Sequence, residues 1–359
     1  MSRILVTIVA AALMAVSAFL VPAVRHVTHA APAGAKYEGE LDVIDWEGYT
    51  DPSFVKSFQR QTGCVVKSTY AGSSDEMFAK FRGGGGTSYD LVSASGDASL
   101  RVIQSGAVQA VDLKRLAHWK NLLPQLKSPP HNTVNGKHYG ISFMWGPDVL
   151  VYNTRVFKTA PTSWRVLYDK RYSGKISVPD NAIQIADVAV MLGYKHPYNL
   201  SDSQLATIKS VLQKQRPLVR KYWGSAGDFT NLFKSNEIVV GAAWPLMTVQ
   251  LKQAHAPVGE TIPKEGATGW ADTWMLNVHA RHPNCAYAWM NYATSPAVQK
   301  QVVAVTGYSP ANARTAQLLG PKESAALHIT DLKYFNSLKF WLTPPNYPKW
   351  QQIWNEIKG

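Results

Sequence analysis

Four short segments place tryptophan or tyrosine beside small or acidic residues, and a fifth, SGD, offers small and acidic residues alone. They are DWEGY (45–49), SGD (95–97), AAW (242–244), GWADTW (269–274) and TGY (306–308). The faces of Trp and Tyr rings attract cations, and each well-placed contact in a desolvated site contributes about 0.5 to 2 kcal/mol. A neighbouring carboxylate neutralises an ammonium group. Together the segments suit a receptor for an organic cation, although any one tryptophan is equally suited to a core.

No pattern for covalent or metal catalysis accompanies these segments. The chain has neither a G-x-S-x-G nucleophile turn nor an HExxH motif. His279 and His282 are three residues apart without an evident third ligand, so we interpret them as loop residues. Gly83 to Gly86 lack a following Lys-Ser/Thr and predict a turn. We therefore expect no catalytic residue, metal or cofactor, while two distant carboxylates acting as glycosidase acids stay open as an alternative.

The elements that position these segments alternate between strand and helix. GELDVIDW (39–46), CVVKSTY (64–70) and YDLVSAS (89–95) have strand patterns. A helix is expected in 51–63, and S-x-x-E and S-x-x-Q capping boxes begin others at Ser73 and Ser201. This order predicts a parallel, doubly wound α/β sheet with ligands beyond the carboxyl ends of its strands.

Length and charge limit the classes of protein that fit. A chain of 359 residues is too long for one core, and 46% apolar with 17% charged residues indicates a globular protein. The net charge of +13 admits nucleic acid, an anionic membrane or an acidic ligand as partners. Its Lys and Arg residues are dispersed, however, with RPLVRKYW (216–223) among the densest clusters, so nucleic-acid binding is not expected.

The first 30 residues are typical of a secretory signal peptide. MSR precedes an uncharged apolar run over 4–24, and small residues follow near Ala30. Cleavage is favoured over retention as a membrane anchor, and the absence of a nearby cysteine excludes a lipoprotein. The mature chain, with 35 basic and 24 acidic residues, is expected in the periplasm. There Cys64 and Cys285 could form a disulfide, with two buried free thiols as the alternative.

Longer segments of the sequence resemble a known family. The segments DWEGY, FQRQTGCVV, SSDEMFAKF, YDLVSASGDASLR, YGISFMWGPDVLVYNT, TSWRVLYDKRYSGKISVPDNA, PKEGATGWADTWML and TGYSPAN are similar to periplasmic solute-binding proteins of ABC importers, in the spermidine/putrescine-binding family. The resemblance implies a two-lobe type II periplasmic-binding-protein (Venus-flytrap) fold, each lobe a doubly wound α/β sheet flanked by helices. Lobe 1 is expected over 37–145 plus 272–309, and lobe 2 over 146–271 plus 310–359.

The same resemblance implies a set of ligand-binding positions. Asp272 is the expected amine carboxylate, with a local turn cap as its alternative role. The resemblance also implies that the following residues bind the ligand: Trp46, Glu47, Tyr49, Ser95, Asp97, Asn181, Gln184, Trp244, Trp270 and Tyr308.

The chain departs from the family at the charged end of the site. The family's pair of amine-binding acids falls on Asn181 and Gln184, which are neutral, and Met247 replaces an acid of some relatives. Glu47 and Asp97 could restore negative charge; alternatively Glu47 is a solvated loop acid and Asp97 caps the helix through Arg101. A ligand of lower charge than spermidine is therefore an open alternative.

The function expected from the resemblance is binding without catalysis. A polyamine or related amine of the putrescine/spermidine class would bind between the lobes of a monomer, which delivers it to the transmembrane subunits of an ABC permease. The alternatives are a secreted hydrolase using the same cleft and a receptor of the same fold for a non-polyamine ligand. A ferric-ion receptor is disfavoured because the chain has no adjacent tyrosines.

Overall fold

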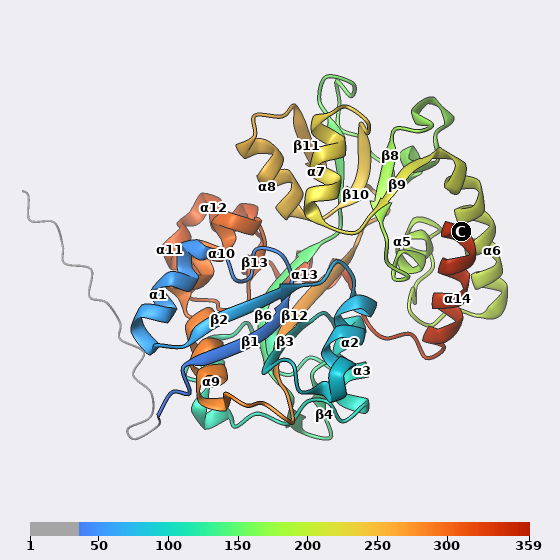
Figure 1. The fold of residues 1–359 in the computed structure, drawn as a ribbon. Coiled ribbons are helices and arrows are strands. Elements are labelled where there is room, and N and C mark those ends of the chain that lie inside the picture. Colours follow the sequence, from blue (N-terminus) through green and yellow to red (C-terminus); the bar gives the residue numbers. More distant parts are fainter. Residues whose placement is uncertain (1–35) are drawn as a thin grey trace, which may run out of the picture.

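The computed structural model describes residues 36–359, and the expected signal peptide at 1–30 lies outside them. The described chain folds into two α/β lobes, each built on its own sheet (Figure 1). This arrangement confirms the two-lobe fold class expected from the sequence. No helix within 36–359 combines the length and the apolar character that a membrane crossing requires.

The first lobe contains a seven-stranded sheet. Its strands lie in the order β13 (Ser309–Pro310), β6 (Ile141–Pro147), β12 (Thr268–Leu276), β3 (Leu91–Ala94), β1 (Glu40–Asp45) and β2 (Val65–Tyr70), with β14 (Lys339–Phe340) paired to β12. A separate hairpin pairs β4 (Thr133–Val134) with β5 (Lys137–His138). The helices of this lobe are α1 (Pro52–Thr62), α2 (Ser74–Arg82), α3 (Gly96–Gln104), α4 (Pro124–Lys127), α9 (Pro283–Ala293), α10 (Pro296–Thr306), α11 (Thr315–Leu319), α12 (Pro321–Ala326) and α13 (Leu332–Ser337).

The second lobe contains a five-stranded sheet in the order β11 (Val258–Thr261), β7 (Val149–Asn153), β10 (Val240–Ala243), β8 (Ile176–Pro179) and β9 (Val219–Trp223). Its helices are α5 (Gln184–Met191), α6 (Asp202–Gln215), α7 (Ala226–Lys234), α8 (Pro245–Gln253) and α14 (Tyr347–Lys358). Figure 1 shows this lobe above and to the right of the first, with the C-terminus on α14.

Most local signals read from the sequence form as expected at the start of the chain. Asp51 caps α1 by accepting a hydrogen bond from Ser53 N at 2.8 Å, and Gly63 ends the helix with φ 73°. Ser73 caps α2 by accepting from Glu76 N, but Glu76 accepts from Gly72 N, so the expected capping box is only half formed there. A complete capping box begins α6 at Ser201. The side chains of these caps satisfy backbone N–H groups that have no partner in the first turn.

The sheets are mixed, which differs from the all-parallel arrangement that the alternation predicts. β1 pairs in parallel with β2 and β3, and β8 pairs in parallel with β9 and β10. In contrast, β12 runs antiparallel to β3 and β6, and β7 runs antiparallel to β10 and β11. The physical reason is that the chain crosses between the lobes through β6–β7 and returns through β12, so these strands enter their sheets in the opposite direction.

The segment after β12 divides between the lobes. The sequence expectation assigned 310–359 to the second lobe, but β14 pairs with β12 and Phe335 packs edge-on against Trp145 at 5.0 Å, both within the first lobe. The aromatic packing explains why this part of the chain stays there. The final helix, α14, lies against the second lobe, where Trp354 Nε1 donates to Asp180 Oδ1 at 2.9 Å.

Cys64 and Cys285 form a disulfide, with their Cα atoms 5.9 Å apart. The bond connects the residue that precedes β2 to helix α9, 221 positions along the chain. It therefore links the N-terminal part of the first lobe to the part that follows the return from the second.

Candidate ligand-binding site

An aromatic pocket lies where the two lobes meet. We refer to it as the aromatic pocket from here on. It is lined by Trp46, Ser95, Trp244, Trp270, Asp272, Tyr308 and Trp341. Six of the seven were expected from the sequence. The volume open to the centres of water molecules is about 10 Å³, which is roughly the room that one water needs. The pocket is therefore closed tightly around its own side chains.

Strand ends position most of these side chains. Trp46 follows β1, Ser95 follows β3 and Trp244 follows β10, as expected for carboxyl ends that meet at one edge. Trp270 and Asp272 lie two residues apart on β12, so they point to the same face of the sheet. Tyr308 follows Gly307, whose φ of 70° ends α10 and turns the chain back toward the pocket.

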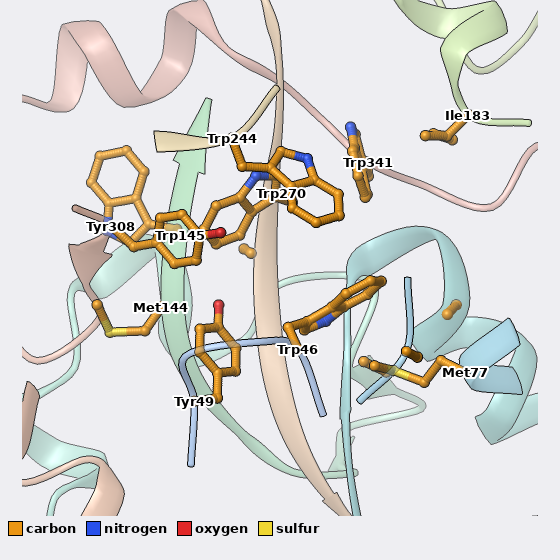
Figure 2. Packing of buried hydrophobic residues seen from close by; sticks show 14 of the residues in the cluster. Trp46, Tyr49, Met77, Met144, Trp145, Ile183, Trp244, Trp270, Tyr308 and Trp341 are labelled. Carbon is orange, nitrogen blue, oxygen red and sulfur yellow. The ribbon is translucent and has the colours of Figure 1, made fainter. Parts of the chain in front are cut away.

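The aromatic rings form edge-to-face pairs at the junction. Trp46 of the first lobe meets Trp244 of the second with ring centroids 5.6 Å apart, and Trp270 meets Tyr308 at 4.3 Å. Figure 2 shows these four rings converging, with the Tyr49 hydroxyl directed toward them from below. Such pairs leave ring faces available to a cation if the pocket opens.

Asp272 is the acidic centre of the pocket. Its carboxylate accepts hydrogen bonds from the hydroxyls of Tyr49 and Ser95, and it is only 2% exposed. Burial removes water from the carboxylate and raises the pKa of Asp272 to about 7, although the two hydroxyls lower it. No Lys, Arg or His within 36–359 forms an ion pair with it. The site thus offers negative charge without a cation.

The remaining expected residues lie around the pocket rather than in its lining. Tyr49 is buried beneath it through its bond to Asp272. Glu47 accepts a hydrogen bond from Gln250 Nε2 at 2.9 Å, which connects the two lobes. It also lines a second cavity of about 240 Å³ that shares Trp46, Trp244 and Tyr308 with the aromatic pocket. That cavity, which also includes Tyr70 and Glu76, extends the site along the junction.

Three expected residues do not reach the lining of the aromatic pocket. Asp97 is fully buried and accepts from the Ser74 hydroxyl at 2.8 Å, and burial raises its pKa to about 6. It lies inside the first turn of α3, whose cap is Ser95. Asn181 Oδ1 accepts from Ile183 N at 3.3 Å, and Gln184 begins α5 and lines a small cavity inside the second lobe.

Sequence reasoning missed Trp341, which comes from the segment between β14 and α14. Its backbone N–H donates to Gly269 O at 2.7 Å, and this bond places the indole beside Trp270. No strand or helix pattern surrounds Trp341 in the sequence, so its approach to the pocket depends on a tertiary contact. Only its aromatic character could have suggested it.

A metal-compatible cluster elsewhere is satisfied by the protein itself. Atoms of Asp42, Asp90 and His282 lie within 4.8 Å of one another on the first lobe. Asp42 pairs with Arg281 at 2.6 Å, and Asp90 accepts bonds from the backbone N–H of Asp42, Arg281 and His282. The His282 ring also contacts Asp90 at 2.8 Å. These donors satisfy the cluster. His279 and His282 lie in the loop before α9, as expected, with His279 exposed and His282 partly buried against Asp90.

Comparisons with known proteins agree with this architecture. Residues 53–329 match the family model described as bacterial extracellular solute-binding protein. The chain is 28% identical over 294 residues to the spermidine/putrescine-binding periplasmic protein of Escherichia coli K12, covering 81% of this chain and 82% of that protein. It is 27% identical over 311 residues to a putrescine/agmatine-binding protein of Pseudomonas aeruginosa, covering 81% and 83%.

Solved structures show the same fold at lower identity. The spermidine/putrescine ABC transporter substrate-binding protein PotD of Streptococcus pneumoniae superposes with a TM-score of 0.71 at 21% identity, covering 89% of this chain and 97% of that one. MotA of Agrobacterium tumefaciens, in complex with glucopine, superposes with a TM-score of 0.74 at 14% identity, covering 89% and 100%.

Proposed function

Because this chain belongs to the bacterial extracellular solute-binding protein family, we propose that it is the substrate-binding component of an ABC transporter for a polyamine or related organic amine. The observation that carries the proposal is Asp272, a buried carboxylate that has no basic partner in the described part of the chain and is enclosed by Trp and Tyr rings. An ammonium group satisfies both features, since it pairs with the carboxylate and is attracted to the ring faces. The polyamine-binding relatives support the same ligand class.

The structure suits a mechanism in which the lobes close on the ligand. Trp46 and Ser95 come from the first lobe and Trp244 from the second, so a ligand that contacts all three stabilises the closed form. Closure excludes water and strengthens the pairing between ammonium and carboxylate. The closed monomer would act in the periplasm and pass the amine to permease subunits. The proposed role is binding without catalysis, in which the Ser95 hydroxyl orients the Asp272 carboxylate for the ligand.

A thermal-shift panel tests the proposal. Putrescine, spermidine, agmatine and n-butylamine are compared with 1-butanol as a neutral control, and turnover is assayed in parallel. We expect an amine to raise the melting temperature. At a concentration one hundred times its Kd, the ligand adds about 2.7 kcal/mol to the free energy of unfolding. If no amine shifts the melting temperature, the proposed function fails. Turnover of a substrate would instead favour the secreted hydrolase.

One further observation favours a second candidate ligand. The indole N–H groups of Trp46, Trp270 and Trp341 are buried without hydrogen-bond partners among residues 36–359, and such donors suit an acceptor. The panel therefore includes γ-aminobutyrate, which carries a carboxylate as well as an ammonium group. A shift with γ-aminobutyrate that exceeds the shift with n-butylamine would identify a receptor for a zwitterionic amine.

A further inference from the structure

A second pair of acids lies at the base of the lobe junction. Asp148 connects β6 to β7, Thr268 begins the returning strand β12, and Asp187 lies on α5 of the second lobe. The backbone N–H of Asp148 donates to Thr268 O at 3.0 Å, so the two crossing strands are joined at this point. The acids are thus held where both lobes and the crossing strands meet.

The two carboxyl groups share a single hydroxyl. Thr268 Oγ1 lies 2.7 Å from Asp148 Oδ2 and also contacts Asp187 Oδ1. A threonine hydroxyl has one proton to donate. One carboxyl group must therefore carry a proton of its own and donate it to Oγ1, or both must bear charge beside each other.

Among the residues that the structure describes, no Lys, Arg or His forms an ion pair with either acid. Asp148 is 3% exposed, and its Oδ1 has no hydrogen-bond partner within 36–359; the same holds for the buried Oδ2 of Asp187. Burial raises the pKa of both carboxyl groups, and the charge of Asp148 raises that of Asp187 further. Two buried acids that share a site retain a proton until a cation replaces it.

The acid pair lies in line with the aromatic pocket. Thr268, Trp270 and Asp272 alternate along β12, so all three face the same side of the sheet. The indoles of Trp244 and Trp341 line the pocket and lower the pKa of Asp148, without a hydrogen bond of ordinary geometry to it. Figure 2 shows Trp341 on the Ile183 side of the pocket, toward the start of α5.

Asp187 also compensates for the missing family acids. It lies three residues after Gln184 on α5, on the same helical face and about one turn further along. With Gln184 it lines the small cavity inside the second lobe, so the negative charge absent at Asn181 and Gln184 is present one turn further along α5.

We propose that Asp148 and Asp187 bind a second ammonium group of the ligand, at the end of the site opposite Asp272. This inference rests on the proposed function, because it names which amines the receptor takes. The ligand chain passes the Trp341 indole, and the second ammonium replaces the proton that the acid pair shares. Thr268 then donates to one carboxylate while the ammonium group donates to the unpartnered oxygens.

Strand geometry sets the length of the ligand. Four residues separate Thr268 from Asp272, or about 13 Å along β12. An extended chain advances roughly 1.2 Å per bond, so the terminal nitrogens of spermidine, about nine bonds apart, span roughly 11 Å. Those of putrescine, about five bonds apart, span roughly 6 Å. The two acidic ends therefore fit spermidine and are too far apart for putrescine to bridge.

Calorimetry with spermidine and n-butylamine tests the inference. We expect the double variant Asp148→Asn/Asp187→Asn to lose about 100-fold or more in affinity for spermidine and to bind n-butylamine as the wild type does. Asp272→Asn should weaken both amines. The control Asp202→Asn removes a charge on the same lobe whose side chain is 81% exposed, and should change neither. Unchanged spermidine affinity in the double variant would overturn the inference while leaving the proposed function intact.

Proton release by the wild type provides a measurement that does not depend on the variants folding. Heats of binding near pH 7 in buffers of different ionisation enthalpy give the number of protons released. Spermidine should release more protons than n-butylamine, because only spermidine displaces the proton of the acid pair. Equal release would overturn the inference. If the wild type binds neither amine, the proposed function fails and this inference fails with it.

Discussion

The Tyr49 hydroxyl donates a hydrogen bond to Asp272 Oδ2 at the floor of the aromatic pocket, and both side chains are buried. The two residues are 223 positions apart in the chain. Tyr49 follows β1 and Asp272 lies on β12, so the bond connects the start of the first lobe to the strand that returns from the second. It holds the carboxylate in place and stabilises its anionic form.

Replacing Tyr49 by Phe should weaken amine binding at pH 7. Loss of a hydrogen bond to a charged group costs about 1.5 to 3 kcal/mol, or roughly 10- to 100-fold in Kd. The matched control is Tyr292→Phe, which removes a buried hydroxyl that donates to Phe54 O at 2.8 Å, away from the pocket. Calorimetry that gives equal affinities for the two variants would remove Tyr49 from the site.

Amine affinity should rise with pH up to about 7 and then level off. The pKa of Asp272 is raised to about 7 by burial, so below this pH the ligand must first displace a proton from the carboxyl group. The expected slope for Asp272 alone is about tenfold in Kd per pH unit below 7. Titration of n-butylamine, whose ammonium group stays charged throughout, isolates this carboxyl group.

The variant Asp272→Asn provides the control for this pH profile. It should bind n-butylamine weakly and with little dependence on pH between 5 and 8, because the titrating group is gone. A wild-type profile that is flat over the same range would show that Asp272 is already ionised in the free protein.

Much of the aromatic pocket could be predicted because its residues lie at strand ends. Alternating apolar residues identify β1 and β3, and the positions directly after them, Trp46 and Ser95, necessarily meet at the edge of a parallel sheet. The composition of GWADTW then indicates which face of β12 carries Trp270 and Asp272. Local pattern and sheet geometry indicate where these residues lie, and the family resemblance was needed to assign them to the ligand.

The residues that sequence reasoning missed depend on long-range contacts. Asp148 contacts Thr268, 120 positions away, only because two crossing strands pair at the junction. Trp341 reaches the pocket through a backbone bond to Gly269 from a segment without a regular pattern. The mixed direction of the sheets has the same origin, since nothing local in the sequence records that the chain crosses between lobes.

Reduction of the disulfide should destabilise the first lobe. The bond between Cys64 and Cys285 closes a loop of 221 residues, and loss of such a bond costs about 2 to 5 kcal/mol. We expect urea unfolding followed by tryptophan fluorescence to shift to lower urea in the presence of a reductant. The variant Cys64→Ser/Cys285→Ser should match the reduced protein and respond no further to reductant. A reductant-independent midpoint in the wild type would contradict the predicted role.

The ligand-free protein should become less stable between pH 4 and pH 7. Burial raises the pKa of Asp45 and Asp272 from 3.8 to about 7, so the folded state holds protons that the unfolded chain releases. This stabilisation is fully present below pH 3.8 and is lost as the pH rises through 7. Each of these two carboxyl groups changes the free energy of unfolding by about 4 kcal/mol at most.

Urea unfolding at pH 5.5 and pH 8 measures this dependence. Asp45→Asn should reduce the difference between the two free energies of unfolding, because Asp45 is fully buried with only its Oδ1 hydrogen-bonded, to Ser68. Amine ligand should restore stability at pH 8 by pairing with Asp272. A free energy of unfolding that rises from pH 5.5 to pH 8 without ligand would contradict the prediction.

Contact between two glycines should limit how closely the lobes approach. A Cβ atom added to Gly72, which follows β2, would lie 1.8 Å from Gly224 O of the second lobe. Real side chains do not tolerate this separation, and the obstacle is backbone. Gly72→Val should therefore hold the lobes apart while leaving each lobe folded, and we expect a loss in amine affinity on the order of 100-fold.

Gly83→Val is the matched control, because Gly83 lies in the same lobe with φ −63° and nothing in the described chain within 4 Å of an added Cβ. Small-angle X-ray scattering with saturating amine should show contraction of the wild type and of Gly83→Val. Gly72→Val should keep the larger radius of gyration even at ligand concentrations that saturate it. Contraction of Gly72→Val to the wild-type radius would mean that the lobes close without the contact between Gly72 and Gly224. The hydrogen bond from Gln250 to Glu47 across the junction would then be the next contact to remove.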